Sequence, residues 1–237
     1  MSGAPTFRPP ERPIRVVTID GPAGAGKSTV ARMLARELGF TYLDTGAMYR
    51  AATWHVLRSG IPLEDSQALT AAVAGLTMRL EPDPAGMRVW VNDTEVTGLI
   101  RTPEVTAHIW RVDEVPGVRE VLVAWQRSFG ETHDTVAEGR DMGTVVFPDA
   151  PCKIYMDASP ECRARRRATE WAAKGLKADF DQVLQDILER DRKNMTRAVS
   201  PLRPAQDAVL IDTTGLSQEE VLRQILAVAR ERLESGS

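Results

Sequence analysis

The chain has 237 residues, of which 43% are apolar, and a formal net charge of -3. This length and composition suffice for one sizeable α/β core with small inserted parts. The charge provides no overall field that would attract nucleic acid or an anionic membrane, and no segment reaches the apolar length of a membrane span. Because Cys152 and Cys162 are predicted to be free thiols, we expect a cytoplasmic protein.

The first element after the proline-rich leader is a strand. Residues 1–13 lack the apolar core of a secretory signal and are expected to form a flexible leader. Val16–Asp20 then predicts a buried strand, and apolar residues at helical spacing follow from Val30 up to Gly39. Between them, Gly21–Ser28 has the pattern G-x-x-x-x-G-K-S, which is typical of a phosphate-binding loop in this strand and helix context. The alternative is a chance match in a glycine-containing loop.

The residue types of this loop fit phosphate chemistry. Glycine tolerates dihedrals that turn the N–H groups of Gly24 to Ser28 inward, and a helix N-terminus adds partial positive charge. Lys27 would reach the outer phosphates, and the Ser28 hydroxyl would ligate Mg²⁺. The loop leaves open whether the phosphate passes to water, to a small molecule, or nowhere.

Strand-like runs recur along the chain and alternate with helical patterns. This alternation favours a parallel sheet with helices on both faces. A capping-box pair, Ser217 and Glu220, predicts the start of the last helix. The five predicted strands are Val16–Asp20, Phe40–Asp44, Thr135–Glu138, Cys152–Asp157 and Val209–Asp212.

One region breaks the alternation and predicts an inserted lobe. Leu76–Leu80, a turn-rich segment at 82–86 and Met87–Val91 indicate a small antiparallel meander. Such strands do not easily join a parallel sheet. We therefore assign 71–113 to the insert and divide the core between 14–70 and 114–237.

Two arginine-bearing segments follow the fourth strand of the core. A helix predicted to start at Ser159 and Pro160 places three arginines on one face, and Phe180 to Arg197 predicts a second helix. The second helix has a predicted buried stripe of Phe180, Val183, Leu184, Ile187 and Leu188, and a polar stripe of Arg190, Asn194 and Arg197. On their own, the arginines of the first helix, Arg163, Arg166 and Arg167, are as compatible with a solvated face or a nucleic-acid patch as with a role toward a transferred phosphate.

The arrangement of these helices favours a lid. They flank a short connection that contains Gly175, so we predict a lid over about 159–178 that closes over a phosphate and excludes water. Exclusion of water favours transfer to an acceptor over hydrolysis. A phosphate monoester acceptor needs no strong base, and the scattered His55, His108 and His133 are predicted to be ordinary surface or core residues.

The chain resembles the bacterial cytidylate kinases, which phosphorylate CMP and dCMP from ATP. The resemblance covers nearly everything after the leader and implies a P-loop kinase with a central five-stranded parallel sheet, helices on both faces, an inserted small antiparallel acceptor-binding lobe and a helical lid. It rests on the segments I-D-G-P-A-G-A-G-K-S-T (19–29), L-D-T-G-A-M-Y-R (43–50), I-R-T-P-E-V (100–105), E-G-R-D-M-G-T-V-V-F-P-D-A (138–150) and R-A-V-S-P-L (197–202).

The resemblance implies a role for each matching residue. The ATP-binding residues would be Gly21, Pro22, Ala23, Gly24, Ala25, Gly26, Lys27, Ser28 and Thr29. The catalytic residues would be Lys27, Arg163 and Arg167, and Mg²⁺ would be bound by Ser28 and, through water, by Glu138. The acceptor nucleotide would contact Thr45, Tyr49, Arg50, Arg119, Arg140, Asp141, Arg190, Asn194 and Arg197.

Within the acceptor set, the resemblance divides the work between phosphate and base. Arg50, Arg140 and Arg197 would hold the phosphate, because a guanidinium binds phosphate oxygens in pairs. Asp141 would accept from the cytosine amine and Arg119 would donate to the acceptor edge. An internal ion pair between Arg140 and Asp141 is the alternative interpretation.

Two residues depart from the family pattern. Trp110 stands where a small polar residue often contacts the base, and Asn194 stands where an aspartate usually faces the sugar. Asn keeps an acceptor oxygen but loses the charge, so hydroxyl recognition is expected to be weakened.

The resulting expectation is a monomeric enzyme with small-molecule partners. ATP and CMP or dCMP would be its substrates, with Mg²⁺ as cofactor and without nucleic-acid or membrane partners. One alternative is a kinase of another nucleoside monophosphate or small molecule on the same fold. An ATP-binding regulatory switch without turnover is the alternative from another class.

Overall fold

The computed structural model describes residues 15–83, 86–173, 175, 177 and 179–235, so the predicted leader lies outside the described residues. Its centre is a five-stranded sheet with the order β2-β6-β1-β7-β8, in which every neighbouring pair is parallel. The strands are β1 (Val16–Asp20), β2 (Thr41–Asp44), β6 (Thr135–Glu138), β7 (Cys152–Asp157) and β8 (Val209–Asp212). The predicted parallel sheet is confirmed, with β2 beginning one residue later than expected.

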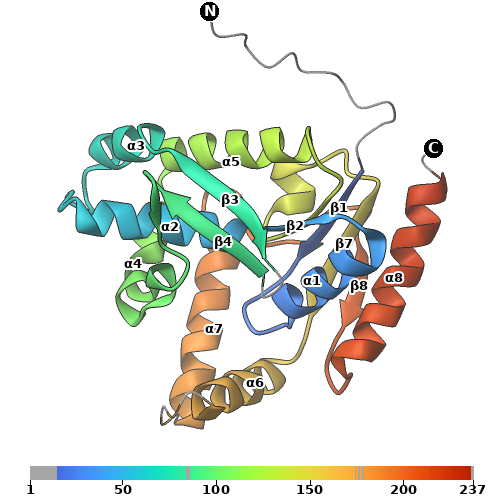
Figure 1. Cartoon of the computed structure of the whole chain (residues 1–237). Helices are drawn as coiled ribbons and strands as arrows, with labels where there is room; N and C mark the ends of the chain where they lie inside the picture. The colour runs from blue at the N-terminus through green and yellow to red at the C-terminus, as the bar shows by residue number, and fades with distance from the viewer. Residues whose placement is uncertain (1–14, 84–85, 174, 176, 178, 236–237) are drawn as a thin grey trace, which may run out of the picture.

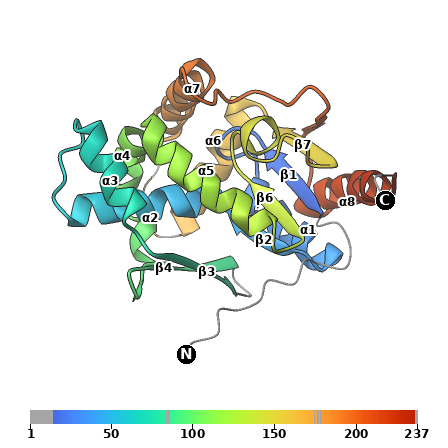
Figure 2. The same cartoon turned by 90° about the horizontal axis from the view of Figure 1, so that it is seen from above.

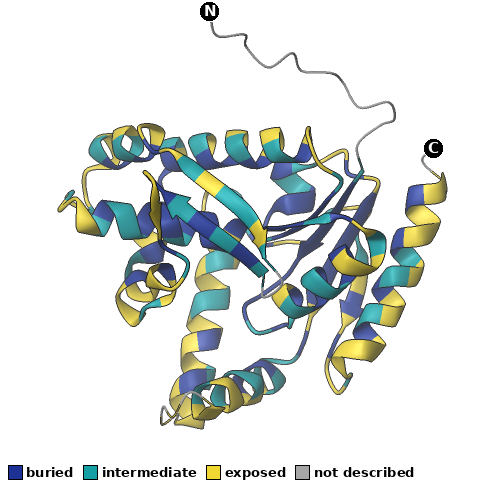
Figure 3. Cartoon of the chain, viewed as in Figure 1, coloured by how far each residue is buried: buried dark blue, intermediate teal, exposed yellow. Residues whose placement is uncertain are grey.

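Helices cover both faces of this sheet (Figures 1 and 2). Neighbouring residues of β6 point to opposite faces, since Val136 belongs to one apolar cluster and Ala137 to another. The first cluster packs α1 (Lys27–Leu38) and α8 (Gln218–Ser235) against the sheet. The second joins it to α2 (Thr45–Arg58), α5 (Pro116–Gly130) and the π-helical turn η2 (Met142–Val146). The central strands are accordingly buried along their length (Figure 3).

Local sequence signals set the helix ends. Gly39 ends α1 in the left-handed conformation, with φ of 67°, and its N–H bonds to carbonyls of the last turn. Ser217 and Glu220 form the predicted capping box before α8: the Ser217 N–H donates to Glu220 Oε2 at 2.8 Å, and the Glu220 N–H donates to Ser217 Oγ at 3.2 Å.

The insert contains the predicted antiparallel meander. Its sheet consists of β3 (Met78–Asp83), β4 (Gly86–Val91) and β5 (Thr94–Glu95). It lies between α3 (Ser66–Ala74) and, after the turn η1 (Leu99–Arg101), α4 (Pro103–Asp113). Pro82, predicted in the turn, instead lies within β3, opposite Met87 and one residue before the end of the strand. Because β3 is an edge strand, the missing N–H is tolerated there. The limits 71–113 of the insert stay a prediction.

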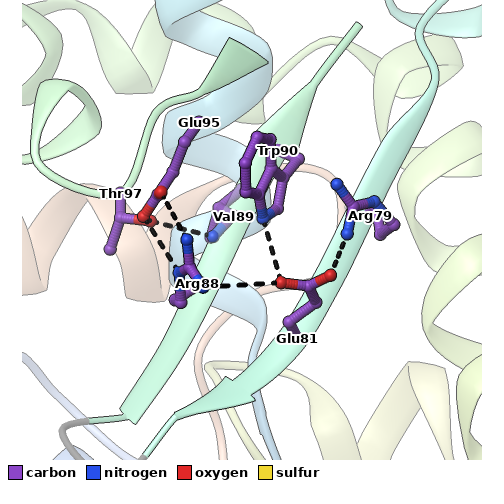
Figure 4. A network of polar contacts seen from close by, with 7 residues as sticks. All are labelled: Arg79, Glu81, Arg88, Val89, Trp90, Glu95 and Thr97. Carbon is purple, nitrogen blue, oxygen red and sulfur yellow. Dashed lines mark hydrogen bonds and ion pairs between the residues drawn. The ribbon is translucent and has the colours of Figure 1, made fainter. Parts of the chain in front are cut away.

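Polar side chains hold the outer face of the insert sheet together (Figure 4). Glu81 pairs with Arg79 and accepts from Trp90 Nε1 at 3.2 Å. Arg88 pairs with Glu95 at 2.7 Å and lies 5.4 Å from the centre of the Trp90 ring. These side chains are partly exposed, so their ion pairs contribute little stability and chiefly fix the side-chain positions.

Two helices extend from the core as a separate arm (Figure 1). They are α6 (Pro160–Ala173) and α7 (Phe180–Thr196), and they pack on one another through Ala164, Val183 and Ile187. The predicted buried stripe of α7 was too wide, because Phe180 and Leu188 are 36% and 41% exposed. The arm projects from the body, so only a narrow strip of α7 is covered by a neighbour.

The described residues include no helix that is both long enough and apolar enough to span a membrane. 

Packing of α8 on the sheet is predicted to be a main source of stability. Ile225 is fully buried between α8 and the sheet, so Ile225→Ala should lower the free energy of unfolding by about 2–5 kcal/mol. Urea denaturation measures this loss. Gln224→Ala, at the exposed neighbouring position, is the control and should change stability by less than about 0.5 kcal/mol. Equal effects of the two substitutions would contradict the assigned packing.

Candidate active site

A cleft of about 1550 Å³ opens between the glycine-rich loop, α2, the insert and the α6–α7 arm. Drug-sized ligands occupy pockets of roughly 300–1,000 Å³, so this cleft has room for two ligands. It lies at the carboxyl ends of β1 and β6, where parallel α/β sheets bind ligands. The donor and acceptor sites predicted from the sequence therefore share one space.

The glycine-rich loop leads directly from β1 into α1. Gly21 has a φ of +143°, and a Cβ there would lie 1.9 Å from the Met156 carbonyl oxygen, so only glycine fits. The carbonyls on the outside of the loop are held from α6: Ala23 O accepts from Arg163 at 3.2 Å, and Ala25 O accepts from Arg166 at 3.3 Å. In the described part of the chain, the N–H groups of Gly24, Ala25 and Gly26 donate to no partner. They remain available to a phosphate.

Lys27 begins α1 and is buried at the floor of the cleft. Its Nζ donates to the Pro22 carbonyl at 2.8 Å, so the ammonium group closes the loop on itself. Burial and then the charge of Arg140 lower the pKa of Lys27, whereas Glu138 and Asp20 raise it. A bound polyphosphate would supply the negative charge that this lysine lacks.

Asp20 joins the donor loop to the segment after β6. Its two carboxylate oxygens accept from the Met142 and Gly143 N–H groups, each at 2.8 Å. Burial raises the pKa of Asp20 to about 6, although both amide bonds lower it. Arg140 adds a second link by donating to Gly21 O at 3.0 Å. The two loops are therefore positioned relative to each other by a buried carboxylate to which the sequence assigned no role.

Four arginines converge on the cleft opposite the loop. Arg50 comes from α2, Arg140 from the segment after β6, Arg167 from α6 and Arg190 from α7. Burial, and then Arg140, Arg50 and Arg167, lower the pKa of Arg190 to about 10. Burial and neighbouring arginines also lower the pKa values of Arg50 and Arg140. Like charges held this close favour a polyanionic ligand such as a phosphate monoester.

At the other end of the acceptor region, Arg119 and Asp141 form a buried ion pair. Arg119 NH1 also donates to the Asp113 carbonyl at 3.3 Å, and the guanidinium lies 5.4 Å from the Tyr49 ring centre. The sequence alternative of a pair between Arg140 and Asp141 is wrong, because Arg140 donates to the carbonyls of Gly21 and Gly139 instead. The pair presents donors and an acceptor side by side.

The cleft collects most of the predicted site residues. Its wall includes Ala23, Gly24, Ala25, Gly26, Lys27, Ser28, Thr29, Thr45, Tyr49, Arg50, Arg119, Glu138, Arg140, Asp141, Arg167, Arg190, Asn194 and Arg197. Gly21 and Pro22 do not line it and instead contribute carbonyls to Arg140 and Lys27.

Arg163 requires a correction. It is not part of the cleft wall but lies beneath the loop, with 3% of its surface exposed. Its guanidinium pairs with Asp191 of α7 at 2.6 Å and donates to Ala158 O and Ala23 O. All of these partners are protein groups, so the structure gives Arg163 a supporting position. Sequence spacing grouped it with Arg167 because it could not show which arginine faces the core.

Three residues of the cleft wall were not among the predicted site residues. Asp113 lines the cleft from α4, and Arg166 holds Thr213 and the loop. Trp110 is 40% exposed on the cleft wall, with Lys193 of α7 5.4 Å from its ring centre. The sequence did offer one signal for Trp110 and Asp113. They are three residues apart on one helix, and residues at this spacing share a helix face, so both could be expected to face the same space.

The donor atoms near Ser28 fit a magnesium ion bound mainly by phosphate and water. In the residues that the structure describes, no group of three or more His, Cys, Asp or Glu side chains could hold a metal ion. Glu138 is buried, accepts from Tyr42 Oη at 2.5 Å and also interacts with Ser28 and Lys27. A hydroxyl and one carboxylate are the hard oxygen donors that Mg²⁺ prefers, and it commonly keeps several waters.

Loss of the Asp141 carboxylate is predicted to destabilise the fold. Asp141→Ala leaves the buried Arg119 without its counter-charge, which should cost about 3–5 kcal/mol of unfolding free energy. Chemical denaturation tests this, with Asp149→Ala at an exposed position of the same segment as the control. If both variants lose the same small amount, Arg119 and Asp141 do not depend on one another.

Comparisons with known proteins agree in placing the chain in one family. The cytidylate kinase family profile matches residues 17–231. The cytidylate kinase of Rhodococcus opacus (strain B4) is 51% identical over 218 residues, covering 92% of this chain and 95% of that protein. A bifunctional pantoate ligase/cytidylate kinase from Synechococcus sp. (strain JA-2-3B'a(2-13)) is 48% identical over 232 residues, and the match spans 97% of this chain but 42% of that longer protein.

A solved structure supports the fold independently. An uncharacterised protein from Eubacterium ventriosum ATCC 27560 superposes with a TM-score of 0.52 at 11% sequence identity, covering 91% of this chain and 98% of that one. This likeness concerns the fold alone. The profile and the two sequence relatives show that the chain belongs to the cytidylate kinase family.

Proposed function

We propose that this chain transfers the terminal phosphoryl group of ATP directly to CMP and dCMP. The observation that carries the proposal is the pair of phosphate-binding groups in one cleft, the glycine-rich loop on one side and the arginines around Arg190 on the other. A hydrolase or a switch needs only the first. Two such groups hold a donor and an acceptor phosphate next to each other. The effective concentration of one phosphate near the other is then far higher than for the same molecules free in solution.

In this proposal the loop and the arginines divide the charge of the reaction. The free N–H groups of Gly24 to Gly26 hold the donor phosphates, and Lys27 exchanges Pro22 O for a phosphate oxygen. Arg167 stabilises charge on the transferring group from the α6 side. Ser28 and, through water, Glu138 would hold a Mg²⁺ ion, which would neutralise negative charge on the donor phosphates. The acceptor is already an anion, so no catalytic base is needed.

The acceptor nucleotide would lie with its phosphate at Arg50, Arg140 and Arg197, as the resemblance implies, with Arg190 beside them, and its base at the Arg119–Asp141 pair. Arg119 would donate to the ring acceptors of cytosine, and the free oxygen of Asp141 would accept from the exocyclic amine. Tyr49 Oη and Arg119 Nε are buried without a partner among the described residues, as expected of groups that await a ligand. We expect the enzyme to act as a monomer.

The direct test is ADP production from ATP with CMP, dCMP, UMP and AMP in parallel. We expect the two cytidine nucleotides to be the best substrates. A preference for UMP or AMP would indicate another acceptor on the same fold, and ATP binding without ADP production from any of the four would indicate a regulatory switch.

Lys27 is predicted to act in the transfer itself. Lys27→Met removes the cation beside the donor phosphates, so kcat should fall by a factor of at least about 100 while the melting temperature changes little. Arg230→Met, which removes a charge from the exposed face of α8, is the control and should leave kcat unchanged. A Lys27→Met enzyme with near-wild-type kcat would refute the assignment.

Asn194 is predicted to make sugar discrimination weak. Its Nδ2 is buried in the acceptor region without a described partner, and a neutral hydrogen bond is roughly half as strong as a charge-assisted one. We expect kcat/KM for CMP and dCMP to lie within about tenfold, a difference of about 1.4 kcal/mol. Asn194→Asp should increase the ratio. Identical ratios in the two proteins would show that position 194 does not face the sugar.

A further inference from the structure

Asp113 is a carboxylate on the cleft wall for which the reaction described above has no use. It is the last residue of α4, and its carbonyl, not its carboxylate, accepts from Arg119. Within the described residues, its carboxylate forms no hydrogen bond and no ion pair closer than 4.0 Å. Asp113 is half-buried, and a partly buried carboxylate that has no protein partner and lies on the wall of a binding cleft is a candidate for contact with a ligand.

The charges around Asp113 locate it along the acceptor region. Burial raises the pKa of its carboxyl group, and Arg197, Arg119 and Arg190 lower it, in that order of strength. Arg119 belongs to the base-reading pair with Asp141. Arg190 belongs to the arginines that crowd around the acceptor phosphate. Contacts of α4 agree with this position: the Asp113 carbonyl accepts from Arg119, and Trp110, three residues earlier, lies beside Lys193 of α7, three residues after Arg190. Asp113 therefore lies between the two ends.

In a nucleoside monophosphate, the sugar lies between base and phosphate. Its hydroxyl groups are hydrogen-bond donors, and an ionised carboxylate accepts but cannot donate. Asn194 Nδ2 and Arg197 NH2 are also buried in this region without a described partner, and both are donors. A hydroxyl bonded to Asp113 could still accept from these donors through its oxygen. The region therefore contains complementary partners for a hydroxyl-bearing group.

We propose that Asp113 binds the ribose hydroxyl edge of the acceptor nucleotide and thereby sets how far the enzyme depends on the sugar hydroxyls. The inference rests on the proposed function, because it takes the two ends of the acceptor region from it. Asp113 is the charged member of the sugar site, and Asn194 is the neutral one. The carboxylate also offsets the positive charge of Arg190 and Arg197 near the sugar.

The test compares four acceptors in the wild type, Asp113→Asn and Asp113→Ala. They are CMP, dCMP, 2′,3′-dideoxy-CMP and UMP, each with ATP. Because the dideoxy compound has no ribose hydroxyl to donate, its kcat/KM should hold or rise when the negative charge is removed beside the arginines. The kcat/KM for CMP should fall, so that the ratio of CMP to dideoxy-CMP drops by about tenfold in Asp113→Asn and further in Asp113→Ala.

Two outcomes would overturn the proposal. One is an equal fall for CMP and dideoxy-CMP, which would make Asp113 a structural or general electrostatic residue. The other is an altered ratio of CMP to UMP with an unchanged ratio of CMP to dideoxy-CMP, which would place Asp113 at the base. Glu104→Gln, at the exposed start of the same helix, is the matched control and should alter neither ratio.

Failure of the proposed function gives a different result. In that case the wild type itself makes no ADP with any of the four nucleotides. Calorimetric titration of the wild type and Asp113→Asn with CMP and dideoxy-CMP then tests the sugar contact without turnover. A ratio of dissociation constants that is the same in both proteins would overturn it.

Discussion

The structure depends on holding several positively charged side chains close together, largely buried, in one cleft. Lys27 lies at the glycine-rich loop, while Arg50, Arg140 and Arg190 come from α2, the segment after β6 and α7. Burial and mutual repulsion lower the pKa values of all four groups. Keeping these groups charged in the empty cleft therefore reduces the stability of the folded chain. Two bound phosphates would remove that repulsion. The repulsion between these cations therefore lowers folding stability when the cleft is empty, and the same repulsion favours the binding of phosphates.

Buried acidic groups make this arrangement possible without neutralising it. Asp20 uses both oxygens on the amides of Met142 and Gly143, so it fixes the backbone rather than pairing with a cation. Asp191 and Asp141 pair with Arg163 and Arg119, which leaves Arg50, Arg140 and Arg190 without carboxylate partners in the described ion pairs. Arg167, the fourth arginine of this group, pairs with Glu170 at 3.9 Å. The charges of Arg119 and Arg163 are thus compensated by carboxylates, while the part of the cleft around Arg190 keeps a positive charge.

The insert and the α6–α7 arm complete the cleft from opposite sides. The insert contributes the α4 wall with Asp113, and the arm contributes Arg167 and Arg190. Trp110 of α4 and Lys193 of α7 approach each other across the opening, with a ring-centre distance of 5.4 Å. Only a narrow apolar strip joins α7 to α6, so the arm has less packing to restrain it than the core helices have.

Local sequence determined the elements and the donor loop. The run at Val16–Asp20, the spacing of Gly21, Gly26 and Lys27, and the cap at Ser217 depend on interactions within a few residues, so their structure could be predicted. The same holds for the antiparallel meander, where turn residues and alternating burial coincide. The predicted acceptor residues came from the family resemblance, and all nine of them line the cleft.

Tertiary structure alone decided which side chains face the cleft and what they bind. Arg163 and Arg167 are one helical turn apart, yet the first is buried beneath the loop and the second lines the cleft. Asp141 pairs with Arg119, 22 residues earlier, rather than with its neighbour Arg140. Asp20 reaches amides 122 and 123 residues away. Such contacts depend on the packing of distant segments, because burial and charge compensation are properties of the assembled core and not of local spacing.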